Sequence, residues 1–165
     1  MNHVIIIGKN LNIFEDLSNF FENRNISIIK PNDNNDLPNL SGVALSGLNI
    51  ETIICSTEYE KHLGGQEKLL AFARENKIKK IIIISEDKSI EDYTILNELG
   101  GALKRLTFND IYNKITKEII FHCCVTDNSY SAGDEKTFEL LSLSSRVALT
   151  DVTVFINGPT GSGKE

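Results

Sequence analysis

Apolar residues recur along the first 125 positions in two alternating patterns. Short continuous apolar runs at 3–8, 26–30, 50–55 and 79–85 predict strands that are buried on both faces of a sheet. Between them, the stretches 11–24 and 66–76 carry apolar residues at helical spacing. The stretch 89–99 is also expected to be a helix, because Ser89 and Asp92 resemble a capping box. A short fifth strand at 102–106 and a helix at 108–125 complete the alternation.

Strands that alternate with helices of this length predict a parallel sheet with helices on both faces. We therefore expect an α/β domain over residues 1–125, with a flavodoxin-like, doubly wound sheet of five parallel strands in the order 2-1-3-4-5. Residues 56–65 are expected to form a loop and residues 126–133 a linker. A helix at 135–149 and a strand at 151–157 then begin a second unit over residues 134–165, which is expected to be truncated.

Composition restricts the possible functions further. The 165 residues carry a net charge of −6, so nucleic-acid binding by this segment is not expected. Three cysteines, two of them adjacent, do not form a disulfide framework, and a reducing cytoplasmic location is expected. The N-terminal apolar run is too short for a signal peptide or a membrane span. The histidines lie far apart in the sequence, so no metal site is expected, and no catalytic residues are assigned.

The C-terminal segment matches the phosphate-binding pattern G-x-x-x-x-G-K directly after a predicted strand. Glycines in such a loop let backbone N–H groups point at phosphate oxygens, and the lysine adds a positive charge. Glu165 stands where a Mg²⁺-binding Ser or Thr is usual, which leaves a glycine-rich turn as the alternative. The expected nucleotide-binding residues are Gly158, Pro159, Thr160, Gly161, Ser162, Gly163, Lys164 and Glu165.

The stretch RVALTDVTVFINGPTGSGKE resembles the start of the AAA+ domain of sigma-54-dependent transcription activators, in which Glu follows the motif lysine. It departs from that pattern at Phe155, Pro159 and Thr160, and Pro159 has no backbone N–H. The preceding GDEKTFELLSLSSRVA is similar to the FlbD-like flagellar regulators. The resemblance implies ATP and Mg²⁺ as cofactors, and sigma-54 RNA polymerase and a self-oligomer as partners, of the complete protein. The present chain is expected neither to be an enzyme nor to bind a cofactor tightly.

A five-unit βα domain ahead of that start resembles the receiver of response regulators. The resemblance implies an acidic pair after the first strand, an acceptor Asp after the third, Ser or Thr after the fourth and Lys after the fifth. The corresponding positions here are Gly8 and Lys9, Ser56, Ser85 and Thr107. Only Ser85 fits its role, so we expect a degenerate pocket that accepts no phosphoryl group.

Such a domain is expected to act through a regulatory protein partner, on the face that carries the fourth helix, the fifth strand and the fifth helix. Tyr93, Leu103, Arg105 and Tyr112 are the candidates for that face.

Other possibilities stay open. The chain could be a free-standing interaction module, or a true phospho-signalling receiver that uses Ser56 or another residue. Lys9 could bind an anion, although a solvated lysine is the preferred interpretation. Glu58 and Glu60 could bind a cation, although a charged loop face is preferred.

Overall fold

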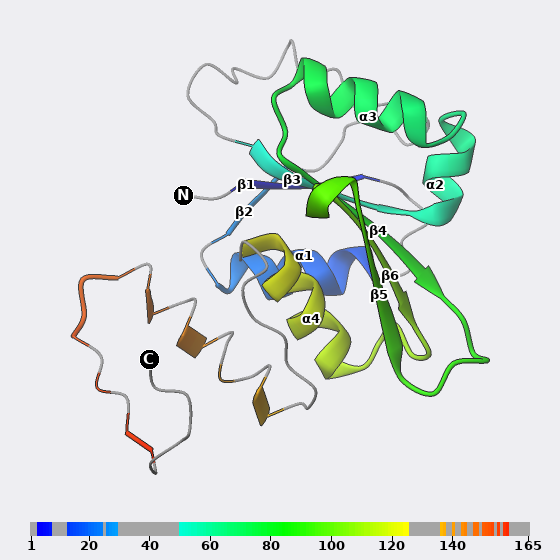
Figure 1. Cartoon of the computed structure of the whole chain (residues 1–165). Helices are drawn as coiled ribbons and strands as arrows, with labels where there is room; N and C mark the ends of the chain where they lie inside the picture. The colour runs from blue at the N-terminus through cyan, green and yellow to red at the C-terminus, as the bar shows by residue number, and fades with distance from the viewer. Residues whose placement is uncertain are drawn as a thin grey trace.

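The computed structural model describes residues 3–7, 13–24, 26–29 and 50–125, and from the C-terminal part residues 136–137, 140, 143–144, 147–148, 150–153, 155 and 157–158. The first 125 residues form an α/β fold in which helices cover both faces of a mixed sheet (Figure 1).

The sheet has six strands in the order β2-β1-β3-β4-β6-β5. The strands are β1 (His3–Ile7), β2 (Ser27–Ile29), β3 (Ile50–Ser56), β4 (Lys80–Glu86), β5 (Tyr93–Glu98) and β6 (Leu103–Phe108). All neighbouring pairs are parallel except β5 and β6, which are antiparallel. The carboxyl ends of the parallel strands therefore meet at one edge of the sheet.

The prediction of five parallel strands alone is wrong in one segment, because the expected helix at 89–99 is the antiparallel edge strand β5. Ser89 does not cap a helix: its backbone N–H and its hydroxyl both donate to the Asp87 carboxylate, at 2.8 and 2.6 Å. Both hydrogen bonds lower the pKa of Asp87, and the bond from the Ser89 hydroxyl contributes most. The segment then pairs with β6, where Tyr93 and Ile95 have side chains suited to a strand. Tertiary pairing thus overrides the local signal of a capping box.

Within the part of the chain that the structure describes up to residue 125, two helices cover each face of the sheet. On one face lie α1 (Phe14–Glu22) and α4 (Lys114–Val125), and on the other lie α2 (Thr57–His62) and α3 (Gln66–Glu75) (Figure 1). A short 3₁₀ turn, η1 (Leu99–Gly101), joins β5 to β6. The expected loop at 56–65 is wrong for its first half, which forms α2. Gly64 and Gly65 then reverse the chain with φ values of 93° and 100°, which residues that carry a Cβ atom rarely adopt.

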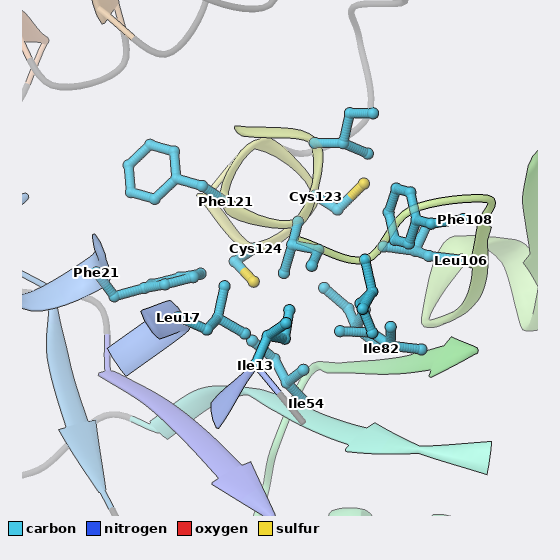
Figure 2. Close-up of a cluster of buried hydrophobic side chains, with 14 of the residues drawn as sticks. Ile13, Leu17, Phe21, Ile54, Ile82, Leu106, Phe108, Phe121, Cys123 and Cys124 are labelled. Atoms are coloured by element: carbon cyan, nitrogen blue, oxygen red, sulfur yellow. The ribbon is translucent and has the colours of Figure 1, made fainter. Parts of the chain in front are cut away.

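The larger core lies between the sheet and the helices α1 and α4 (Figure 2). Phe21 of α1 and Phe121 of α4 meet edge to face, with their ring centroids 5.5 Å apart. Cys123 and Cys124 are buried in the same cluster. Its fully buried members also include Ile13, Leu17, Ile54, Ile82, Leu106 and Phe108.

An ion pair joins the chain just after α1 to α4 at the border of this core. Arg24 donates to the Glu118 carboxylate at 2.5 Å, and both side chains are largely buried. The Arg24 guanidinium also lies 3.5 Å from the centroid of the Phe20 ring. A planar cation can stack on an aromatic ring and bind a carboxylate at its rim, so Arg24 ties α1 to α4 through both contacts.

The described part of the C-terminal unit is sparse. Residues 136–137, 140, 143–144 and 147 are helical, as the predicted helix at 135–149 requires. Positions 151–153, 155 and 157 of the predicted strand are not in a strand. Val152 and Phe155 are 67% and 88% exposed. The described residues of this segment therefore add no strand to the six-stranded sheet.

Candidate functional site

The carboxyl edge of the parallel strands carries the predicted pocket residues that the structure describes. Ser56 ends β3, Ser85 lies next to the end of β4, and Thr107 lies next to the end of β6. Gly8 and Lys9 follow β1 but lie outside the described residues. The edge of an open α/β sheet where the strands end is a common place for ligands, so the side chains there decide what the site can do.

Ser56 performs a structural task at this edge. It is buried, and its Oγ accepts a hydrogen bond from the backbone N–H of Tyr59 at 3.1 Å. Its backbone is extended, with φ −84° and ψ 158°, as is usual for a residue that caps the N-terminus of a helix. The first turn of α2 also carries Glu58 and Glu60, which suit the positive end of the helix dipole. Ser56 therefore ends the strand and starts the helix.

Ser85 and Thr107 form a hydroxyl pair across two strands. Their Oγ and Oγ1 atoms lie 2.9 Å apart, and either can donate. The two residues are direct partners in the parallel register of β4 and β6. The bond joins the ends of these strands and leaves one hydroxyl hydrogen available to a further acceptor.

The register separates Ser56 from that pair. Ser56 is in register with Ile84, which faces the core beneath α1 and α4. Side chains alternate along a strand, so Ser85, the next residue, faces the side of α2 and α3. The structure thus brings together two of the three described pocket residues and places the third on the other face.

The main charged cluster near this edge is centred on Arg105 of β6. Its two terminal nitrogens donate to the two carboxylate oxygens of Glu60 at 2.7 and 2.8 Å. Its Nε donates to Glu98 of β5 at 3.0 Å, and a further bond reaches Gln66 of α3 at 3.3 Å. This bidentate geometry is the strongest form of an Arg–carboxylate pair. One side chain thereby joins α2, α3, β5 and β6.

The cluster alters the electrostatics of its surroundings. Hydrogen bonding to Glu60 raises the pKa of Arg105 above its ordinary value, and contacts with Glu98 add to the effect. Burial, together with the charge of Glu60 and against the opposing charge of Arg105, raises the pKa of the nearby Cys55 thiol to about 12. A thiol with this pKa stays protonated near neutral pH and is a poor nucleophile.

Burial of Glu60 and Leu103 corrects two sequence-based interpretations. Glu60 does not belong to a charged loop face, because it is buried and paired with Arg105. Leu103 cannot contribute to a partner surface, since it is fully buried beneath α2 and α3. Tyr93 packs against Phe108, with ring centroids 6.3 Å apart. Of the expected surface residues, Tyr112 is clearly accessible, at 54% exposure.

Sequence reasoning missed the Arg105 cluster because its members lie far apart in the chain. Arg105 and Glu60 are separated by 45 positions, and no spacing rule connects them. The capping role of Ser56 had a usable signal: a Ser directly after an apolar strand, with two acidic residues in the following turn.

The phosphate-loop prediction can be placed only at its first residue. Gly158 is half-buried, whereas residues 159–165 lie outside the described part of the chain. Within the described residues, no group of three His, Cys, Asp or Glu side chains is arranged to hold a metal ion. No helix in that part is long and apolar enough to cross a membrane.

Comparisons with protein-family models, with curated proteins and with solved structures find no match for this chain.

Proposed function

We propose that the chain is the regulatory N-terminal portion of a sigma-54-dependent transcription activator of the flagellar type. Its α/β domain acts as a degenerate receiver, related to flavodoxin-like domains, that works through contact with a regulatory protein. The segment 158–165 contributes the phosphate loop for ATP, with Mg²⁺, once the rest of the AAA+ domain is present. That complete protein self-associates and acts on sigma-54 RNA polymerase in the cytoplasm.

The single observation that carries the proposal of a degenerate receiver is that the Ser56 hydroxyl is buried and caps a helix. Phosphoryl transfer to a side chain needs an accessible nucleophile and a cation or metal that neutralises the transferred charge. The Ser56 hydroxyl is buried and accepts the Tyr59 N–H. The guanidinium cation of Arg105 in β6 is already paired with the carboxylates of Glu60 and Glu98. The described edge is therefore built for structural contacts.

The proposal is tested first by acetyl phosphate with Mg²⁺, followed by intact-mass measurement. We expect no mass gain of one phosphoryl group, while an active receiver treated in parallel gains it. An adduct on this chain that disappears in Ser56→Ala would instead support a phospho-signalling receiver.

The second test concerns the phosphate loop. In the complete protein, Lys164→Ala should abolish ATP hydrolysis and transcription from sigma-54 promoters, because the lysine binds the β- and γ-phosphates. Ser56→Thr, which keeps the capping oxygen, should leave both activities intact. A reading frame that stops at Glu165 would overturn the ATPase part and favour a free-standing interaction module.

A further inference from the structure

Strand β5 forms an edge of the sheet with an outer side to which no described strand is paired. Edge strands are usually protected from pairing by lysine, proline, a bulge or a covering element. The sequence of β5, YTILNE, contains neither lysine nor proline. The register with β6 runs without interruption from Tyr93 to Glu98, so no bulge bends the strand away. β5 therefore lacks three of these features, a lysine, a proline and a bulge, and no described strand covers its outer side.

The hydrogen-bond pattern shows which backbone groups face outward. The N–H of Asn109 donates to the carbonyl of Asp92 at 2.8 Å, just beyond the strand end, in the register that pairs β5 with β6. Antiparallel pairs alternate between hydrogen-bonded and non-hydrogen-bonded positions. Thr94, Leu96 and Glu98 therefore bond to β6. The N–H and C=O groups of Ile95 and Asn97 point away from the sheet.

Apolar side chains accompany these groups on both faces of the strand. Ile95 is 38% exposed, and Leu96 and Leu99 are each 56% exposed. Leu96 faces the side of α2 and α3 with Arg105, and Ile95 faces the opposite side with Leu106. A strand added to this edge would cover both side chains and satisfy the outward backbone groups.

We propose that a second copy of this chain pairs with β5, antiparallel and around a two-fold axis that passes between the two Leu96 residues. In this register Ile95 lies opposite Asn97 of the second copy, and the two pairs exchange four backbone hydrogen bonds. Leu96 lies opposite Leu96 of the second copy at a non-hydrogen-bonded position, where side chains approach most closely. The interface is isologous, as most homodimer interfaces are.

The side-chain pattern of β5 is self-complementary in this register, because Leu96 meets Leu96 and no charged residue of the strand meets another charge. Each chain has a net charge of −6, so two copies can approach closely only where little charge is exposed. The one charged residue of β5, Glu98, accepts a hydrogen bond from Arg105 at 3.0 Å, and in this register it lies opposite Thr94. A shift by two residues in one direction would place Glu98 opposite Asp92 of the second copy, where the like charges would repel each other. A shift by two residues in the other direction would place the Glu98 carboxylate opposite the apolar Leu96 and separate the two Leu96 side chains.

Sedimentation analysis of the full chain over a wide concentration range tests the interface. The wild type should show a reversible monomer–dimer equilibrium. Leu96→Lys should abolish the dimer, because it places two ammonium groups opposite each other at the axis. Leu140→Lys is the matched control, since Leu140 is comparably exposed, at 61%, but does not belong to β5 or to the residues that flank it, and it should dimerise as the wild type does. A wild type that is monomeric throughout, or a dimer that persists in Leu96→Lys, would overturn the proposal.

A backbone variant tests the hydrogen bonds directly. Ile95→Pro removes two interchain donors per dimer without removing a bond to β6, so the monomer should stay folded. Two lost bonds should weaken dimerisation about thirtyfold. Ile95→Val keeps the N–H and should dimerise almost normally. Equal dissociation constants for these two variants would contradict strand pairing.

Amide hydrogen exchange provides a readout that does not depend on any variant. Exchange at Ile95 and Asn97 should slow as the protein concentration rises, whereas exchange at Thr94 and Leu96, whose N–H groups bond to β6, should not change. Exchange that is independent of concentration at all four positions would exclude pairing at this edge. Pairing requires neither nucleotide nor phosphorylation, so its failure would leave the proposed regulator function untouched.

Discussion

Arg105 joins four elements of the fold, and its removal should therefore weaken the whole domain. In Arg105→Met the Glu60 carboxylate loses both guanidinium donors, which lie 2.7 and 2.8 Å away. Breaking a fully buried ion pair in this way costs roughly 3–5 kcal/mol. The Arg105 side chain is 27% exposed and that of Glu60 8%, so water can replace part of the loss. We expect the free energy of unfolding to fall by about 2–3 kcal/mol, scaled down from that range for solvent access.

A double-mutant cycle separates the pair from the rest of the cluster. Glu60→Gln keeps the size of the side chain and removes its charge, and the double variant with Arg105→Met should be less destabilised than the sum of the two single changes. The coupling energy from urea unfolding should be about 1–2 kcal/mol. A coupling below about 0.5 kcal/mol, which is typical of exposed pairs, would refute the view that Arg105 and Glu60 act as one buried unit.

Three further predictions concern the helix cap at Ser56, the buried thiol of Cys55 and the aromatic core. Ser56→Ala should lower the free energy of unfolding by about 1 kcal/mol through loss of the helix cap, whereas Ser56→Thr should lose markedly less; equal losses in urea unfolding would argue against capping. Because burial raises the pKa of Cys55 to about 12, its contribution is constant below the unfolded pKa of 9.0 and is lost as pH rises toward 12. Stability in Cys55→Ala should accordingly decline less steeply over that window, and identical slopes would contradict burial of a neutral thiol. Phe21→Ala should cost about 3–5 kcal/mol in chemical unfolding, while Phe155→Ala, at an 88% exposed position, should change stability by less than about 0.5 kcal/mol, and a similar cost for both would be inconsistent with this packing.

Hydrophobic pattern alone located most of the regular elements. The apolar runs at 50–55 and 79–85 are the strands β3 and β4, and the spacing at 66–76 corresponds to α3. The reason is physical: a strand buried on both faces needs apolar residues at every position, and a helix on a sheet needs them along one stripe. These requirements are local, so they can be read from a short stretch of sequence.

The remaining elements depend on neighbours that are distant in the chain. The segment 89–99 begins with residues that resemble a capping box, yet the Ser89 hydroxyl donates to Asp87 and β6 supplies backbone partners that a helix could not use. The candidate site shows the same division. The sequence placed Ser85 and Thr107 at strand ends, but the register alone determined that their hydroxyls meet at 2.9 Å.

The amino-acid sequence by itself thus determined the alternation of strands and helices, the acidic balance and the phosphate-loop pattern at residues 158–165. Tertiary structure determined the partners of the polar side chains and of the edge strand. The Ser56 hydroxyl caps a helix, Arg105 pairs with Glu60 across 45 positions, and the outer side of β5 pairs with no described strand. The physical reason is that burial of apolar side chains is set by local periodicity. The partner of a buried charge or of an edge strand is set by which distant segments the fold brings together.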